Sequence, residues 1–153
     1  MSGGFITNKN DANVTGIGTA FAVAKAIRLL ADPLTDPAST HGALPAHPRA
    51  EQLDLVVTVS SGAPATAKVL LTWDAKGDNV AFGPSGTITF AAGLTTTAKR
   101  MATTSILTAP RRPSSGTSGE LWLHLIVDAG TVDLVAADGD LARLHWTDTR
   151  DRV

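Results

Sequence analysis

Short runs of apolar and threonine-rich residues, separated by breaks of Gly, Pro, Asp and Ser, fill the chain from about Leu53 to Trp146. Several breaks carry turn chemistry, among them Ser61-Gly62, Lys76-Gly77-Asp78 and Asp138-Gly139. Short runs between such breaks are typical of an antiparallel β-sandwich or jelly roll. The pattern therefore predicts an all-β fold of about eight strands. These are Gln52–Ser60, Thr66–Trp73, Val80–Phe82, Gly86–Ala91, Lys99–Thr108, Glu120–Val127, Thr131–Ala136 and Asp140–Trp146.

The strand Glu120–Val127 separates two faces most clearly. Its leucines and Val127 alternate with Trp122, His124 and Ile126, and alternate residues of a strand point to opposite faces. The leucine face is expected in the core, and the other face is expected to meet a partner or carry an aromatic cap. The expected core residues are Leu121, Leu123, Leu125, Leu55, Val57, Leu70 and Leu144 or Trp146.

Length and composition limit the classes of protein. At 153 residues the chain fits one domain that can bury a core without disulfide or metal support. The absence of cysteine excludes disulfides, thiolate metal sites and a cysteine nucleophile. The formal charge is −1, from 13 Lys plus Arg and 14 Asp plus Glu. No overall field favours nucleic acid or an anionic membrane, so neither is expected as a partner.

The N-terminal sequence Met1–Asn10 lacks the basic start and continuous apolar stretch of a secretory signal. No run of about 18 apolar residues, the length needed to span a bilayer, is present. We therefore expect a soluble protein that is made in the cytoplasm and used or assembled there.

The first third of the chain has a different texture. Residues 1–18 show no periodicity and predict an extended arm or irregular loop. Residues 19–31 fit a short helix capped by Thr19, although the alternation of Phe21 and Val23 also permits a strand. Four prolines follow between residues 32 and 49, which favours extended or turn structure. The sequence thus predicts an N-terminal arm with a Pro-rich linker over residues 1–50 and a β-sandwich domain over residues 51–153.

An arm of this kind carries apolar side chains that must dock on a surface, because ordering a chain costs roughly 1–2 kcal/mol per residue. We expect that surface on another chain, with packing on the same domain as the alternative. A polar loop over residues 108–119 also carries two adjacent arginines that can reach carboxylates of a neighbouring subunit, or be simply solvated. The assembly candidates are Phe5, Ile6, Phe21, Val23, Ile27, Leu30, Arg111 and Arg112.

Two pairs of residues suggest metal sites. Asp74 and Asp78 could share calcium, but Lys76 holds the ligand position between them and no bidentate Glu follows. A turn in which Asp side chains bind backbone amides is the better interpretation. His124 and His145 lie on strands that could pair and bind zinc, but the other two histidines are in the Pro-rich segment. We therefore expect no bound metal and no cofactor.

No nucleophile stands in a catalytic setting. Serines occur mostly in turns, and no Gly-x-Ser-x-Gly elbow is present. A hydrolase or isomerase on a jelly roll would need a His or carboxylate cluster inside, where Leu, Val and Ile are expected. A carbohydrate-binding module would use Trp73, Trp122 or Trp146 as a stacking platform, although tyrosine is absent. The prediction is a protein that is not an enzyme.

The segments Leu71–Val80 (LTWDAKGDNV), Gly83–Gly86 (GPSG), Leu121–Asp128 (LWLHLIVD) and Ala142–Trp146 (ARLHW) resemble small all-β virion proteins of tailed bacteriophages. The resemblance covers roughly residues 53–147 and carries over no catalytic or binding residue. It implies a capsid decoration (cement) protein that binds the major capsid protein, or a neck, tail or baseplate component. It also implies localisation in the virion after assembly in the host cytoplasm, as a homo-oligomer for which a trimer is possible.

Overall fold

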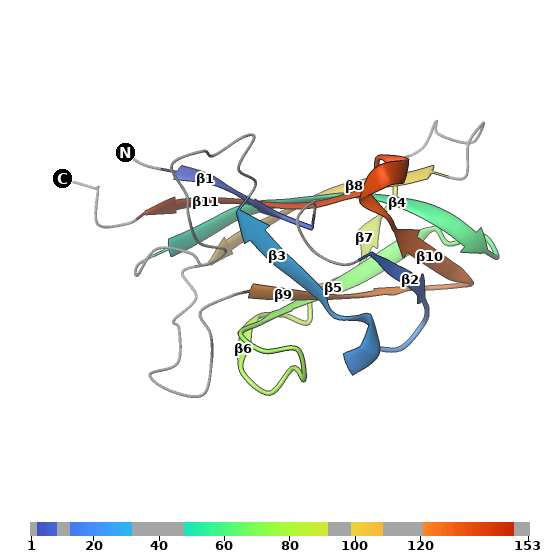
Figure 1. Ribbon diagram of the computed structural model, residues 1–153, viewed down its shortest axis with the longest axis horizontal. Coiled ribbons are helices and arrows are strands. Elements are labelled where there is room, and N and C mark those ends of the chain that lie inside the picture. Colours follow the sequence, from blue (N-terminus) through green and yellow to red (C-terminus); the bar gives the residue numbers. More distant parts are fainter. Residues whose placement is uncertain (1–2, 9–12, 32–47, 92–98, 109–120, 149–153) are drawn as a thin grey trace.

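The computed structural model describes residues 3–8, 13–31, 48–91, 99–108 and 121–148, and these form an antiparallel all-β fold (Figure 1). Eleven strands and two 3-10 turns are present in this part of the chain. The strands are β1 (Gly3–Thr7), β2 (Val14–Ile17), β3 (Ile27–Ala31), β4 (Pro48–Ser61), β5 (Thr66–Thr72), β6 (Val80–Phe82), β7 (Ile88–Thr89), β8 (Lys99–Thr108), β9 (Leu121–Val127), β10 (Thr131–Leu134) and β11 (Leu141–Asp148). The 3-10 turns are η1 (Val23–Lys25) and η2 (Ala136–Asp138).

The all-β class is confirmed, and each of the eight strands predicted after residue 50 is present. The turn residues between them act as expected. Gly62, Gly77, Gly130 and Gly139 all adopt positive φ, the left-handed region that glycine enters without a steric penalty. Strand ends differ by a few residues: β4 begins at Pro48 and not at Gln52, and β7 is shorter than the predicted run over 86–91.

The strands form two packed layers (Figure 1). One contains β1, β11, β4 and β8 and is called the β4 layer; the other contains β9, β5, β6 and β7 and is called the β9 layer. On one side, β3 joins the layers by pairing with both β1 and β9. On the other side, β10 pairs with β4 and β2, and the Gly18 carbonyl after β2 accepts a bond from the Val127 N–H of β9 (3.0 Å). The result is a sandwich bridged at both sides.

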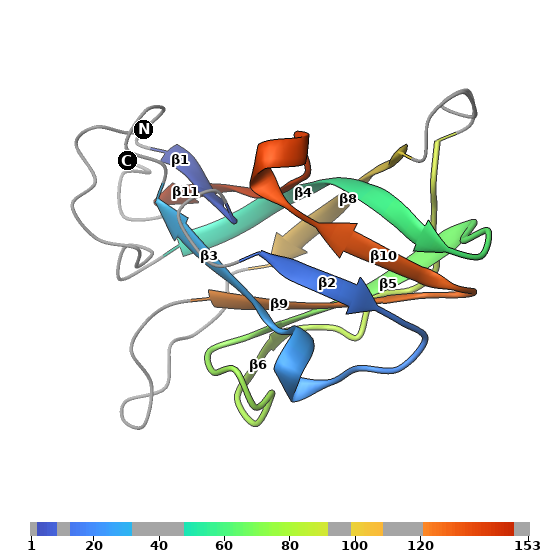
Figure 2. The ribbon, with the colours of Figure 1, turned by 45° about the vertical axis from the view of Figure 1, so that its right-hand side comes forward.

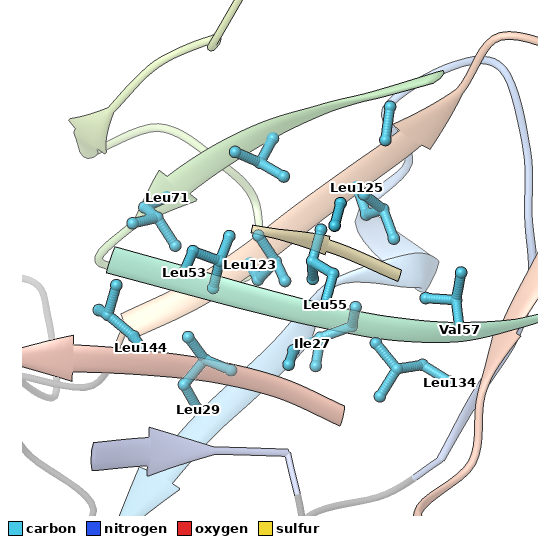
Figure 3. Close-up of a cluster of buried hydrophobic side chains, with 14 of the residues drawn as sticks. Ile27, Leu29, Leu53, Leu55, Val57, Leu71, Leu123, Leu125, Leu134 and Leu144 are labelled. Atoms are coloured by element: carbon cyan, nitrogen blue, oxygen red, sulfur yellow. The ribbon is translucent and has the colours of Figure 1, made fainter. Parts of the chain in front are cut away.

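The space between the layers is filled by aliphatic side chains (Figure 3). The expected core of leucines on β9, with Leu55, Val57 and Leu144, is confirmed. The prediction that Leu70 lies in the core is wrong. Val69 and Leu71 on either side of it point inward, and Leu70 itself is half-buried on the opposite face. Trp146 is half-buried and packs against the core from its edge.

The N-terminal segment is not a separate arm (Figure 2). Its described residues supply β1, β2 and β3, which pair with β11, β10 and β9. Four of its side chains are fully buried in the common core: Ile6, Ile17, Ile27 and Leu29. The predicted boundary at residue 50 therefore falls inside one packed unit, and β4 already begins at Pro48.

The possible helix over residues 19–31 does not form. In its place the chain makes the single turn η1 and then the strand β3. The physical reason is tertiary: β9 offers its edge, and Ile27 and Leu29 pair with Leu123 and Leu121 while both side chains enter the core. The Pro-rich linker falls on residues 32–47, which lie outside the described residues.

Candidate functional site

Six side chains on the outer face of the β4 layer form a polar network that we call the Asp54 cluster. They come from four strands, β1, β4, β8 and β11, whose registers bring them side by side. Phe5 lies opposite His145, and Asp54 lies opposite both Arg143 and Thr103. The members are Phe5, Gln52, Asp54, Thr103, Arg143 and His145.

Asp54 is the centre of this network. Its Oδ2 accepts hydrogen bonds from His145 Nε2 (2.8 Å) and Arg143 Nη2 (3.1 Å). Its Oδ1 accepts from Gln52 Nε2 (2.8 Å) and Thr103 Oγ1 (3.1 Å). Both carboxylate oxygens are thus held by donors from three strands.

Phe5 packs over the cationic side of the network. Its ring meets the His145 ring edge to face, with centroids 4.6 Å apart and planes at 89°. The Arg143 guanidinium lies 5.0 Å from the centre of the Phe5 ring, within range of a cation–π contact. The aromatic ring therefore limits the freedom of both residues that bind Oδ2 of Asp54.

The electrostatics of the cluster favour a permanent negative charge on Asp54. Partial burial opposes ionisation, but the hydrogen bonds from His145, Gln52, Arg143 and Thr103 outweigh it and lower the pKa of Asp54 to about 2. A carboxyl group with this pKa stays ionised at neutral pH and cannot donate a proton. An Asp–His pair can also activate a nucleophile, but the described hydrogen bonds of His145 include no hydroxyl. The cluster joins β4, β8 and β11 through one ionised carboxylate.

Sequence reasoning finds only part of this cluster. It singles out Phe5 for assembly and His145 for zinc, and it misses Asp54. The alternation of Gln52 and Asp54 with buried leucines does place them on an outer face. It contains no information on the strand register that brings Arg143 to Asp54.

The proposed pairing of His124 with His145 is wrong. β9 and β11 belong to different layers and do not pair, and each histidine points to the outer face of its own layer. His124 Nε2 lies 2.9 Å from Thr72 Oγ1, whereas His145 binds Asp54. No zinc site can include both residues in this fold.

His124 is buried under the turn that follows β5. Burial lowers its pKa, and the nearby Asp74, through a hydrogen bond to its backbone and through its charge, only partly opposes that effect. Thr72 Oγ1 also donates to the Asp74 carbonyl (2.6 Å), so one small network joins β5, β9 and the turn. The imidazole is a neutral structural group here.

The Asp74 turn has the structure expected for an Asp that binds backbone amides. Its carboxylate accepts from the Asp78 N–H (3.0 Å), the Asn79 N–H (2.8 Å) and Asn79 Nδ2 (2.9 Å). Although slight burial acts in the opposite direction, these bonds lower the pKa of Asp74. Both oxygens of the Asp74 carboxylate therefore accept hydrogen bonds within the turn, as the sequence predicts.

Asp140 has a similar structural role next to η2. Its buried carboxylate accepts from Lys99 Nζ (2.7 Å), Thr58 Oγ1 (2.8 Å) and the Val135 N–H (2.9 Å). Lys99 Nζ also donates to the Asp138 carbonyl (2.6 Å). This ion pair ties β8 and β4 to the connection between β10 and β11.

The three tryptophans do not form a shared platform. Trp73 is buried in the core, Trp122 is half-buried on the β9 layer, and Trp146 is half-buried on the β4 layer. The Arg28 guanidinium lies 5.9 Å from the centre of the Trp122 ring. A flat sugar-stacking surface built from all three is therefore excluded.

The assembly candidates divide into four groups. Ile6 and Ile27 are buried within this chain and are not accessible to a partner, which corrects the prediction for them. Phe5 and Leu30 are half-buried, whereas Phe21 and Val23 are exposed around η1. Arg111 and Arg112 lie outside the described residues.

Across the described ranges, no three His, Asp or Glu side chains converge in a way that could hold a metal ion. Among the same residues, no helix is long and apolar enough to cross a membrane. No family model, curated protein or solved structure matches the chain.

Proposed function

We propose that this chain is a non-enzymatic structural protein of a tailed-bacteriophage virion, and specifically a capsid decoration protein that binds the lattice of the major capsid protein. The observation that carries the proposal is that four ionisable side chains of the chain have structural roles. Asp54, Asp74, Asp140 and His124 all join strands or close turns, as expected for a rigid building block.

The proposal assigns lattice binding to the sandwich itself and not to an N-terminal arm. Residues that the arm was expected to present, such as Ile6 and Ile27, are buried in the core. The outer face of the β4 layer supports this role because the Asp54 cluster holds its polar groups in place before binding. Ordered side chains lose little entropy on association. Next to the cluster, Met101 and Ser105 are exposed.

The test is the copy number of the chain in purified particles, measured by quantitative mass spectrometry against the major capsid protein. A decoration protein is expected at a stoichiometry comparable to that of the lattice. A few copies per particle would instead indicate the neck, tail or baseplate alternative. Absence from gradient-purified particles would overturn the virion proposal altogether.

A binding assay with undecorated capsid shells tests the face. Arg143→Ala should weaken co-sedimentation with the shells, because it removes a half-buried cation and one of the groups that orders Phe5. Lys76→Ala is the matched control, since Lys76 is an exposed cation on the Asp74 turn of the other layer. Equal binding by the two variants would assign lattice contact to another surface.

A further inference from the structure

A pocket of about 360 Å³ opens on the outer face of the β9 layer, where β9 ends and β5 begins. Its floor comes from these two paired strands, with Lys68 of β5 opposite Ile126 of β9. One wall is Thr19, held next to β9 because the Gly18 carbonyl accepts a bond from the N–H of the last residue of that strand (3.0 Å). The opposite wall is Thr87, directly before β7, which pairs with the other edge of β5. Distant parts of the chain thus meet around one hollow.

Three polar side chains of the pocket are not used by the fold. Among the described contacts, Lys68 makes no hydrogen bond or ion pair, and the hydroxyl groups of Thr19 and Thr87 make no hydrogen bond. All three side chains are exposed. A further hydroxyl group, that of Thr66, lines the same pocket. These groups are therefore available to a ligand.

Asp128 supplies an ordered acceptor at one end of the pocket. Its Oδ1 accepts hydrogen bonds from the Ala65 N–H (2.8 Å) and the Thr66 N–H (3.0 Å). These bonds from Thr66 and Ala65 lower the pKa of Asp128, so the group is ionised at neutral pH. A carboxylate has about four acceptor positions, so this one can still accept from a ligand.

The lining favours a ligand that is uncharged and rich in hydroxyl groups. Asp128 repels a free anion and Lys68 repels a free cation. A zwitterion would match both charges but would leave the threonine hydroxyl groups without a role. Ligand hydroxyl groups donate to the carboxylate, accept from the ammonium group and do either with threonine. Ile126, half-buried on the floor, adds an apolar surface for C–H groups, and a sugar ring presents both kinds of group.

We propose that this pocket binds one sugar ring, whose C–H face packs on Ile126 and whose hydroxyl groups bond to Lys68 and Asp128. The threonines of the two walls fix the orientation of the ring. The volume lies at the lower end of the range for small-molecule sites, about 300–1,000 Å³, which suits a single ring. The pocket and the Asp54 cluster lie on opposite layers, so the inference is independent of the proposed role in a virion.

The first experiment titrates the isotope-labelled full chain and follows its backbone amides by two-dimensional NMR. The probes are methyl glycosides of glucose, galactose and N-acetylglucosamine, with glycine as a zwitterion and acetate as an anion. At least one glycoside or its free sugar should give saturable shifts at Thr66, Lys68 and Thr87, with a dissociation constant of about 1 mM. No saturable shift with any saccharide, or saturation of these amides by glycine or acetate instead, would overturn the proposal.

The free sugars distinguish two sources of the ring. Only in a methyl glycoside is the anomeric oxygen substituted, as it is in the terminal unit of a glycan. Equal binding of a glycoside and its free sugar assigns the pocket to a glycan end. Binding of the free sugar alone assigns it to a soluble monosaccharide.

The second experiment repeats the titration with variants of the pocket. Lys68→Met should weaken binding at least about tenfold, because it removes a charged donor, and Thr87→Val roughly 2–10-fold, because it removes a neutral one. Both side chains are exposed, so both variants should keep the wild-type melting temperature. Lys76→Met is the matched control, since Lys76 is an exposed cation on the Asp74 turn, outside the pocket. Unchanged binding by Lys68→Met, or an equal loss in Lys76→Met, would overturn the proposal.

Discussion

Asp54 shows at the level of a single residue how this fold uses charge. One carboxylate on the surface receives hydrogen bonds from its own strand and from β8 and β11. Asp140 does the same for β4, β8 and the segment after β10. In both cases the carboxylate oxygens accept hydrogen bonds from several segments, so these acidic groups stabilise strand packing.

The pH dependence of folding should reveal the contribution of Asp54. Its pKa is lowered from 3.8 to about 2, so its contribution to stability is present above about pH 4 and is lost as the pH falls towards 2. Asp54→Asn should reduce the free energy of unfolding by about 2 kcal/mol at pH 7. Urea denaturation at pH 7 and at pH 3 should show that the difference from wild type narrows at the lower pH.

Asp78→Asn provides the comparison. Asp78 is exposed in the Asp74 turn and contributes its backbone N–H to that turn. Its substitution should leave the urea midpoint nearly unchanged at both pH values. If Asp54→Asn instead lowers the free energy of unfolding by the same amount at both pH values, the packing of the side chain, and not the charge of its carboxylate, matters at that position.

At the level of elements, two tight connections cross where β4 ends and β10 begins. Gly62 and Gly130 face each other there, both with positive φ. A Cβ on Gly62 would lie 2.7 Å from Gly130 Cα, and a Cβ on Gly130 would overlap the Ser61 carbonyl oxygen. The backbones can approach this closely only because neither residue has a side chain.

Gly130→Ala and Gly139→Ala separate two causes of lost stability: the close approach of two backbones and the strain of a positive φ. Both glycines have positive φ (66° and 83°), but a Cβ on Gly139 would meet nothing within 4 Å. Gly139→Ala should cost about 1–2 kcal/mol from the left-handed conformation alone. Gly130→Ala should cost roughly 3 kcal/mol or more, because the backbone must also move. Thermal unfolding of the two variants gives this comparison, and equal losses would contradict the crossing described here.

For the whole molecule, the most consequential feature is that the described N-terminal segments, residues 3–8 and 13–31, are part of the packed sandwich. β1 and β3 bridge the layers on one side, and β2 completes the other. They bury side chains beside the leucines of β4 and β9. The two layers are therefore not a self-sufficient domain without them.

Removal of the N-terminal strands should abolish folding. Each fully buried aliphatic side chain contributes roughly 1.5–3 kcal/mol, so losing Ile6, Ile17, Ile27 and Leu29 removes about 6–12 kcal/mol. That loss is comparable to the entire stability of a typical domain, about 5–15 kcal/mol. A chain that begins at Ala50 should lack a cooperative thermal transition and aggregate, as judged by circular dichroism and gel filtration.

A point substitution in the full chain is the control for that truncation. Val23 belongs to the same segment but is 57% exposed. Val23→Ala should leave the melting temperature nearly unchanged, because little buried surface is lost. If the chain from Ala50 instead melts cooperatively, the N-terminal strands are dispensable additions to the sandwich.

Local pattern was sufficient for the class of fold and for most of the core. In β9 the alternation of leucines with Trp122 and His124 identifies the inward face, because a strand has a period of two residues whatever it pairs with. The turn after Asp74 was equally predictable, since its hydrogen bonds connect residues at most five positions apart.

Long-range pairing decided the rest. Nothing local to Ile27 and Leu29 distinguishes a helix from a strand, and the choice depends on the free edge of β9, nearly a hundred residues later in the chain. The Asp54 cluster likewise exists only because the register of β1, β4, β8 and β11 brings Phe5, Thr103 and Arg143 together. In strands such as β9 the sequence by itself determined which residues face inward, because the alternation of side chains depends on backbone geometry; for Leu70, Ile6 and Ile27 it did not. The tertiary structure alone decided which strands are neighbours, because strand pairing depends on surfaces that no local segment contains.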